Sequence, residues 1–514
     1  MNQTMSWQNL LAEGIEAVRD QQGNAAKAVL QRALKLNRSD RDIRYWLANA
    51  HRLCGEVDQS HHLFSQLLNE NPADSEAAFG AAYLLRENGQ PELAAKLLAN
   101  LAANMDDAPQ LLLQISGFLR DINQFELALQ VMDRAVERSP HIGDLYFKRA
   151  RLQQALGRFD RAIRDLRKAL DLDPQIGGAW LNLSQLQTFS DAAHPDWQRI
   201  DQTLPASLNR EARMCLAFAK GKGLDDLGHW QEAWDSYRYG NQLQREVFAW
   251  SQPAWPEFVS NTLKSGLQES PTPVNSGRRP VYIIGMLRSG TTLLEQLLSQ
   301  HPEVTARGET NWLAHLHKTR EGQHQVSDQR RQQESELLWT QLRLDGPEHN
   351  VFIDKNPLNF RFVGLLAEVA PEARIIHVNR DGRESCLSCF FQLFQHPDAG
   401  FSYSLDDLVA YYRGYKQLMA HWRRLLGDRM IEINYDELVS EPENSVDRLL
   451  DTLGLDPTRR PDSTAPGTRP IRTASSWQAR QPVHSRSIGR WRHYYEFAPE
   501  FFDALAAIDE KALI

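Results

Sequence analysis

The chain reads VYIIGMLRSGTTLLEQLL from Val281 to Leu298, an apolar run followed by a glycine-bracketed loop and then by apolar residues at helical spacing. This order predicts a buried strand, a tight loop and an amphipathic helix. A loop at the start of a helix presents unpaired N–H groups and the positive end of the helix dipole, so it favours an anion such as phosphate. A plain strand-turn-helix corner is the alternative, because Gly, Ser and Thr also form turns and helix caps.

The loop lacks the lysine that marks an ordinary nucleotide hydrolase. A Walker loop reads G-x-x-x-x-G-K-[ST], with its lysine on the terminal phosphates and its hydroxyl on magnesium. Gly285 and Gly290 have the Walker spacing, but Thr291 stands at the lysine position, and Arg288 is the cation inside the loop. The pattern therefore disfavours an ATP or GTP hydrolase, and it disfavours a phosphoryl-transferring kinase for the same reason.

Length and charge set further limits. The chain has 514 residues, too many for one typical core, and a formal net charge of -8. An acidic chain has no general basic field, which argues against nucleic-acid binding and against electrostatic docking to a membrane. The first residues lack the basic and apolar segments of a signal peptide, and no apolar run is long enough to span a bilayer. We expect a cytoplasmic protein.

The cysteines are few. Cys54, Cys215, Cys386 and Cys389 do not make a disulfide framework, and they suit a reducing compartment. Cys386 and Cys389 have the C-x-x-C spacing of metal and redox sites, but neither a second pair nor a histidine cluster accompanies them. Because structural zinc usually needs four ligands, we expect no metal site.

The first half of the chain repeats itself every 34 residues, the period of tetratricopeptide hairpins. In each copy a turn residue is followed five positions later by a small residue, which lets the second helix of a hairpin pack closely on the first. The clear copies begin at Gly89, Asn123 and Gly157, and the weaker ones at Gly23, Gly55 and Gly228. We expect residues 1–250 to form an all-α tetratricopeptide superhelix, whose concave face is the usual binding surface. An α-solenoid that acts only as a spacer is the alternative.

A proline-rich stretch, residues 251–279, is predicted to be a linker before an α/β domain at residues 280–514. In that domain a second strand-to-helix signal ends at Arg380 and continues into a helix that carries Ser388. Two anion-competent strand ends in one domain indicate a doubly wound parallel sheet, with ligands at the carboxyl ends of its strands. Arg380 and Ser388 are therefore candidates for a second phosphate.

Together these motifs resemble the sulfotransferases that use 3′-phosphoadenosine 5′-phosphosulfate (PAPS). R-S-G-T-T at 288–292 is followed by G-E-T at 308–310, K-N-P at 355–357 and R-D-G-R-x-S-x-x-S at 380–388. The pattern is most similar to the tyrosylprotein and bacterial tetratricopeptide sulfotransferases, and it covers roughly residues 280–495. It implies a P-loop-like parallel-sheet domain that takes PAPS as co-substrate, without a metal, and transfers its sulfuryl group to a hydroxyl.

The resemblance also implies roles for single residues. Glu309 matches the general base, Lys355 the cation on the bridging oxygen, and Arg288 a residue that assists at the sulfuryl group. The residues implied to bind the donor are Arg288, Ser289, Gly290, Thr291 and Thr292 at the 5′-phosphate, Arg380 and Ser388 at the 3′-phosphate, and Tyr435, Ser475, Arg480 and Arg486 around them. Tyrosylprotein enzymes have a lysine where this chain has Gln481, so we expect Arg480 or Arg486 to replace it.

The sequence leaves the acceptor open. A repeat groove suits a protein or peptide, so a peptide tyrosine recruited by the repeats is one expected acceptor, but carbohydrate and small-molecule hydroxyls are alternatives. A second hypothesis is a non-catalytic repeat scaffold with a degenerate nucleotide-binding module. That hypothesis predicts the loss of catalytic residues, yet Arg288, Glu309 and Lys355 are all present.

Overall fold

The structure is a computed structural model of the chain. It describes residues 6–105, 108–248, 250, 253–267, 279–320, 326–343, 351–394, 396–459 and 488–512, with the backbone alone at 340–343. The chain divides into two compact units, Met1–Gln153 and Gln154–Ile514. No helix in the described ranges has the length and apolar character needed to cross a bilayer.

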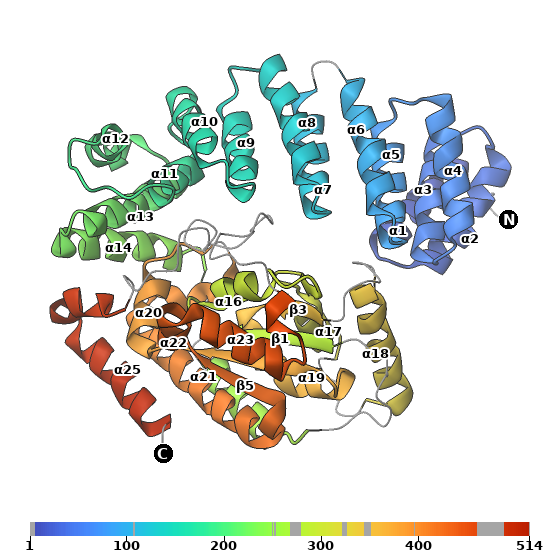
Figure 1. Ribbon diagram of the computed structural model, residues 1–514. Coiled ribbons are helices and arrows are strands. Elements are labelled where there is room, and N and C mark those ends of the chain that lie inside the picture. The colour runs from blue at the N-terminus through green and yellow to red at the C-terminus, as the bar shows by residue number, and fades with distance from the viewer. Residues whose placement is uncertain are drawn as a thin grey trace. The chain divides into compact units, whose positions relative to one another are not determined.

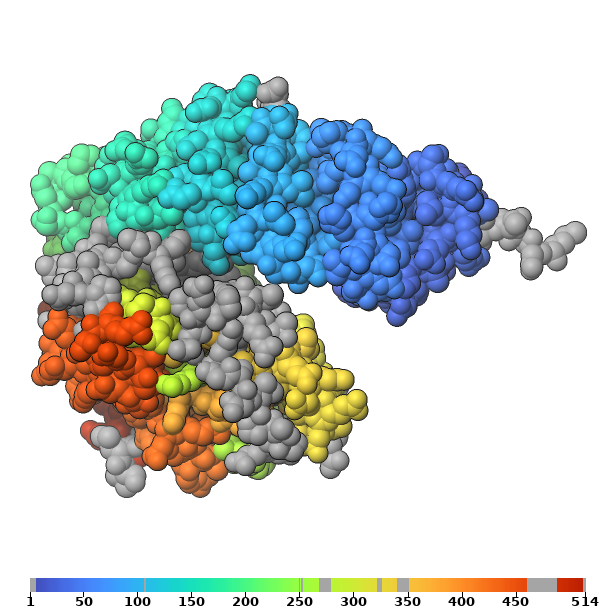
Figure 2. Space-filling view, turned by 45° about the vertical axis from the view of Figure 1, so that its right-hand side comes forward, coloured from blue at the N-terminus to red at the C-terminus, as the bar shows by residue number. Residues whose placement is uncertain are grey.

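The first unit consists of paired helices. They are α1 (Trp7–Arg19), α2 (Gly23–Leu36), α3 (Arg41–Leu53), α4 (Val57–Glu70), α5 (Ser75–Glu87), α6 (Pro91–Ala103), α7 (Pro109–Asp121), α8 (Phe125–Arg138) and α9 (Gly143–Ala155), which runs to the unit boundary. The helices pack in order along the chain (Figure 1). Along the surface of this unit the repeats follow one another from blue to cyan (Figure 2).

The helix pairs share one turn geometry. Left-handed backbone recurs at intervals of 34 residues, at Gln21, Gly55, Gly89, Asn123 and Gly157. Five positions after each stands a fully buried small residue, at Ala26, Ser60, Ala94, Ala128 and Ala162. Ser60 is tolerated there because its hydroxyl donates to the carbonyl of Ala48 at 2.8 Å. The turn ends the first helix of each pair, and the small residue lets the second helix approach closely.

The first repeat differs from the expected register. The sequence pattern placed its turn at Gly23, but the left-handed residue is Gln21, and Ala26 is buried while Ala28 is exposed. The prediction was wrong by two residues because it required glycine at the turn. Other residues also adopt left-handed backbone at single positions, at a modest cost.

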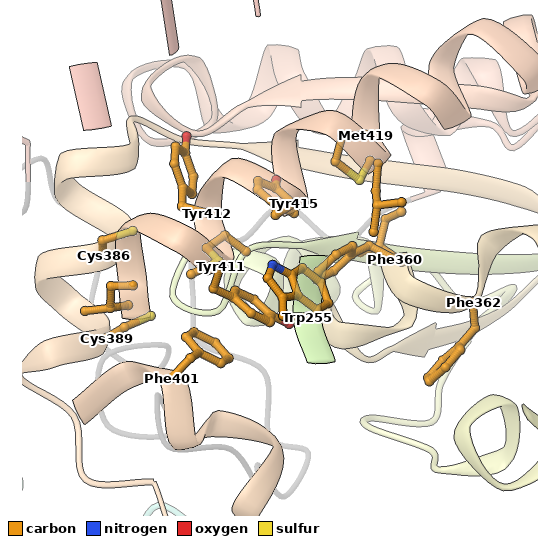
Figure 3. Packing of buried hydrophobic residues seen from close by; sticks show 14 of the residues in the cluster. Trp255, Phe360, Phe362, Cys386, Cys389, Phe401, Tyr411, Tyr412, Tyr415 and Met419 are labelled. Carbon is orange, nitrogen blue, oxygen red and sulfur yellow. The ribbon is translucent and has the colours of Figure 1, made fainter. Parts of the chain in front are cut away.

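The second unit begins with further helices. They are α10 (Phe159–Leu172), α11 (Gly177–Gln185), α12 (Pro195–Gln202), α13 (Arg210–Asp226), α14 (Trp230–Arg245) and α15 (Ala254–Lys264). Helix α15 lies within the stretch assigned to a linker, and its Trp255 stacks on Tyr411 with ring centroids 4.3 Å apart. Tyr411 stacks in turn on Phe401 at 3.5 Å, so these rings form one buried aromatic cluster (Figure 3). The domain boundaries given from the sequence stay a prediction.

The rest of the second unit is built on a five-stranded sheet of order β2-β3-β1-β4-β5, in which every pair is parallel. The strands are β1 (Arg279–Gly285), β2 (Val304–Ala306), β3 (Val351–Lys355), β4 (Arg374–Asn379) and β5 (Met430–Asn434). The accompanying helices are α16 (Thr291–Leu298), α17 (Trp312–Thr319), α18 (Asp328–Arg343), α19 (Val363–Val369), α20 (Gly382–Phe390), α21 (Leu405–Leu426), α22 (Tyr435–Ser440), α23 (Pro442–Thr452) and α25 (Pro499–Ala512).

The sheet is buried on both faces. Val281 and Ile283 of β1 pack with the apolar residues of α16, α22 and α23, whereas Tyr282 and Ile284 pack with those of α17, α19, α20 and α21. Successive side chains of a strand point to opposite faces, so a continuous apolar run suits a strand covered by helices on both sides. The fold class predicted from the sequence, a helical repeat region followed by a parallel-sheet α/β domain, is confirmed.

Candidate active site

The loop after β1 is held in an unusual backbone conformation. Arg288 has φ 68° and Gly290 has φ 101°, both in the left-handed region. For a residue with a side chain this conformation costs of order 1 kcal/mol or more and persists only where the surroundings fix it. The Ser289 side chain is fully buried, and its hydroxyl has no hydrogen-bond partner among the described residues. A buried polar atom without a partner is rare in folded proteins, so the Ser289 hydroxyl is a candidate hydrogen-bonding group for a ligand of the loop.

The second strand end lies next to this loop, because β4 pairs with β1. Arg380 donates from Nη1 to the carbonyl of Arg288 at 2.8 Å, and its guanidinium lies 4.2 Å from the centre of the Tyr435 ring. The same ring covers Gly290 so closely that a Cβ there would lie 2.4 Å from Tyr435 Cδ2. Glycine is therefore required at position 290 both for its φ and for the space that Tyr435 occupies.

Helix α20 contacts the loop through two further side chains. Arg288 donates from Nε to Ser388 Oγ at 3.1 Å, and Cys389 donates from Sγ to the carbonyl of Leu287 at 3.3 Å. Burial lowers the pKa of Arg288 to about 10, so the guanidinium stays charged at neutral pH. Burial likewise raises the pKa of the Cys389 thiol to about 12, which keeps it protonated and able to donate.

The opposite neighbour of β1 is β3, whose last residue is Lys355. The Lys355 side chain is fully buried, and its Nζ lies 2.5 Å from Oε1 of Glu309, whose side chain is 46% exposed. Glu309 thus reaches solvent while its partner does not. Lys355 and Glu309 lie on one side of the β1 loop, and Arg380 lies on the other.

The turn that carries Glu309 is held by Asn356 of the K-N-P motif and by two residues that the sequence did not single out, Glu295 and Asp354. Glu295 of α16 accepts from the backbone N–H of Gly308 at 2.9 Å, and Asn356 donates to the carbonyl of Thr310 at 2.9 Å. Asp354 accepts from the hydroxyl of Thr310 and, at 3.5 Å, from its N–H. Burial raises the pKa of Asp354 to about 7. In the sequence, the indication of a role for Asp354 was its position directly before Lys355.

The structure brings most of the expected residues together. Arg288, Ser289, Gly290, Arg380, Ser388 and Tyr435 form one contiguous group around the loop, and Thr291 and Thr292 form the buried first turn of α16. Glu309 and Lys355 form a second group beside it. Ser475, Arg480 and Arg486, and with them Gln481, lie outside the described residues, so their assigned contacts stay predictions.

The two cysteines of the C-x-x-C pair pack in the hydrophobic core of the second unit. Cys386 and Cys389 are both fully buried on α20, on the side of the helix that faces the aromatic core (Figure 3). Among the residues that the structure describes, no group of three or more His, Cys, Asp and Glu side chains is arranged to hold a metal ion.

Comparison with known proteins finds family matches in both halves of the chain. Residues 280–459 match the sulfotransferase family, and residues 17–83 and 143–176 match tetratricopeptide repeats. The chain carries a sulfotransferase-family domain behind tetratricopeptide repeats. The resemblance inferred from the motifs is thereby confirmed.

Two relatives are similar to part of the chain. An uncharacterized protein of Aquifex aeolicus is 28% identical over 290 residues, which are 53% of this chain and 36% of that protein. Protein-tyrosine sulfotransferase 1 of Danio rerio is 26% identical over 243 residues, 42% of this chain and 65% of that enzyme. The aligned regions thus span about a third to two thirds of these relatives.

Solved structures are also similar to parts of the chain. The sulfotransferase domain of the Synechococcus PCC 7002 olefin synthase has 18% identity and a TM-score of 0.33, over 44% of this chain and 91% of that domain. YrrB, a tetratricopeptide protein with an unusual peptide-binding site, has 17% identity and a TM-score of 0.25, over 40% of this chain and 96% of YrrB.

Proposed function

We propose that the protein transfers the sulfuryl group of PAPS to a hydroxyl acceptor, with Glu309 as general base. The single observation that carries the proposal is the contact of Glu309 with Lys355 beside a phosphate-type loop. Such a transfer needs three groups, which are a carboxylate that reaches solvent, a buried cation and an anion-binding loop. A peptide tyrosine is the acceptor class to test first, since relatives are protein-tyrosine sulfotransferases.

The residues around the β1 loop support a bisphosphorylated donor. The loop N–H groups and the unpartnered Ser289 hydroxyl suit the 5′-phosphate. Arg380 and Ser388 approach the same loop from α20 and its preceding strand, and they suit the 3′-phosphate. One edge of the Tyr435 ring lies against Gly290, and the Arg380 guanidinium lies over the ring. Sulfuryl transfer moves less charge than phosphoryl transfer, so the roles assigned here need no metal.

The Glu309 and Lys355 pair supports the acceptor chemistry. As the acceptor oxygen bonds to sulfur, Glu309 takes its proton, and the bond from sulfur to the bridging oxygen breaks. Lys355 stabilises the negative charge that builds on that oxygen. A free phenol has a pKa of about 10, so proton removal during transfer, rather than before it, suits a carboxylate base. The repeats are proposed to recruit the acceptor, and the proposed location is the cytoplasm.

The test is a transfer assay with labelled PAPS and a panel of tyrosine peptides, glycans and small-molecule hydroxyls. Glu309→Gln keeps the shape of the side chain and removes the base, so transfer is expected to fall about 100- to 10,000-fold. Glu303→Gln is the matched control, because Glu303 lies on the same return segment but pairs with Arg459, and it should retain nearly full activity.

Two results would contradict the proposal in different ways. Equal transfer by Glu309→Gln and wild type would show that Glu309 is not the base. Failure of wild type to bind adenosine 3′,5′-bisphosphate would remove the donor assignment. The member of the panel that is sulfated decides between peptide, glycan and small-molecule acceptors.

A further inference from the structure

Helices α13 and α14 are built into the same compact unit as the sheet. Asn241 of α14 donates to the carbonyl of Phe390 at 2.8 Å, and the Tyr237 ring stacks on Phe391 with centroids 3.9 Å apart. Both contacts are made with the end of α20, the helix that carries Ser388 to the donor site. This hairpin, which has the repeat pattern, is therefore packed directly on an element of the donor site.

The last residues of α13 add a buried ionic contact. Asp225 accepts hydrogen bonds from the guanidinium of Arg490 and from the hydroxyl of Tyr494. The Asp225 side chain is 12% exposed. Removing one partner of such a pair leaves a charge that is out of water and unbalanced, which is costly.

A chain of contacts leads from Arg490 to the β1 loop. The backbone N–H of Gly489, the residue before Arg490, donates to Oε1 of Glu384. The other oxygen of Glu384 lies 3.8 Å from Nη2 of Arg380, and Arg380 donates to the carbonyl of Arg288 at 2.8 Å. Each link is within the second unit. Asp225 is thus four contacts away from the loop, through groups that are themselves mostly buried.

Charge explains why a carboxylate is needed at the start of this chain of contacts. Arg490 and Arg288 are both cations, and after the larger effect of burial the charge of Arg490 also lowers the pKa of Arg288. Asp225 pairs with Arg490, and Glu384 lies 3.8 Å from Arg380. Without Asp225, Arg490, whose side chain is 29% exposed, would lose this partner and could turn toward Glu384 and compete with Arg380 for it.

We propose that Asp225, a residue of the repeat-like hairpin, is a positioning residue for the donor site and acts through Arg490, Glu384 and Arg380. This inference rests on the proposed function for the identity of the donor. It makes the hairpin α13–α14 a part of the catalytic machinery rather than part of the acceptor-recruiting array. Asp225 is proposed to act only through these residues and not by contact with the donor.

The test measures adenosine 3′,5′-bisphosphate affinity by calorimetry in the full chain. Asp225→Asn keeps the shape of the side chain and removes its charge. It should weaken binding of the bisphosphate about 10-fold, the low end of the loss found when a residue that orients a ligand-binding residue is removed. Asp226→Asn is the matched control, since Asp226 is the next residue of the same helix but pairs with Lys222 and with the N–H of Phe189. It is expected to lower the thermal midpoint without changing the affinity.

A double-mutant cycle shows whether the effect runs through Arg490. In an Arg490→Gln background, Asp225→Asn should change the affinity no further, because the partner it positions is absent. Additive losses would overturn the proposal. So would a Asp225→Asn protein that loses only thermal stability and binds the bisphosphate like wild type. Should Asp225→Asn fail to fold, Tyr494→Phe removes one neutral hydrogen bond to the same carboxylate and is expected to weaken binding two- to five-fold, about the value of one such bond.

Hydrogen exchange gives a readout that needs no donor. Amides of residues 286–298 and 380–390 should exchange faster in Asp225→Asn than in wild type, and at the wild-type rate in Asp226→Asn. Equal exchange in all three proteins would overturn the positioning role. If wild type does not bind the bisphosphate, the proposed function fails, and the exchange result still decides whether Asp225 supports the loop.

Discussion

Ser289 has a buried hydroxyl with no hydrogen-bond partner among the described residues. An unsatisfied buried polar group costs about 1 to 3 kcal/mol, so the free protein gains little from this hydroxyl and loses something by burying it. We predict that Ser289→Ala leaves the thermal midpoint equal to or above that of wild type. The same change should weaken adenosine 3′,5′-bisphosphate binding about 10-fold, because a charge-assisted hydrogen bond is worth about 1.5 to 3 kcal/mol.

Calorimetry and a thermal scan on the same protein samples check this prediction. Ser440→Ala serves as the control, since the Ser440 hydroxyl already has backbone acceptors on α22. The control should leave the bisphosphate affinity unchanged. A Ser289→Ala protein that is less stable than wild type, with unchanged affinity, would show that the hydroxyl is structural.

At the scale of the element, strand β3 carries a titrating group next to the proposed base. Burial raises the pKa of Asp354 to about 7, against about 3.9 for a free aspartate. Between these values the folded protein keeps a proton that the unfolded chain has lost, so stability falls as the pH rises from about 4 to about 7. Asp354→Asn cannot titrate. We predict that wild type loses stability relative to this variant by up to about 1.4 kcal/mol per pH unit in that window.

Thermal midpoints of wild type and Asp354→Asn at pH 5 and pH 8 measure the difference. The gap between the two proteins should move in favour of the variant at pH 8. Asp436→Asn is a suitable control, because it makes the same substitution at an exposed residue, at the start of α22. Parallel midpoints for wild type and Asp354→Asn would show that Asp354 does not titrate in this window.

The strand ends show what a sequence can predict about such a site. The loop at 285–290 and Arg380 each follow a predicted apolar strand, and parallel strands bring their carboxyl ends to one edge, so the sequence predicted two anion-binding strand ends in one domain. The family resemblance implied a role for Lys355 and for Glu309, but their contact was not predicted, since they are 46 positions apart in the chain. Glu295, which fastens the turn of Glu309, reads as an ordinary polar position of an amphipathic helix.

Long-range contacts could not be predicted from the sequence, for a physical reason. Asp225 and Arg490 are 265 residues apart, and Asp225 has no local pattern that differs from a solvated charge. Only the fold shows that both are buried together. The sequence also misplaced one turn by two residues. Gln21 has the left-handed backbone of this turn, whereas the repeat pattern suggested Gly23.

At the scale of the whole molecule, the first unit has a surface that suits the recruitment of an acceptor. Tyr83 of α5 is 40% exposed, its ring lies 5.1 Å from that of Phe118 on α7, and Arg86 lies over both rings. Partly exposed aromatic and arginine side chains are the residues that most often dominate binding energy at interfaces. Adjacent repeats therefore share one candidate anchor for a peptide.

If the repeats recruit the acceptor, this anchor should affect acceptor binding and not the chemical step. We predict that Tyr83→Ala raises KM for a peptide acceptor about 10-fold, the scale of a modest interface anchor, and leaves kcat unchanged. Leu93→Ala is the matched control, because Leu93 is 49% exposed on α6, the second helix of the same repeat. Steady-state kinetics with the peptide varied at saturating PAPS measures both constants. A fall in kcat with unchanged KM would contradict recruitment, since a residue that only captures the acceptor cannot alter a step that follows capture.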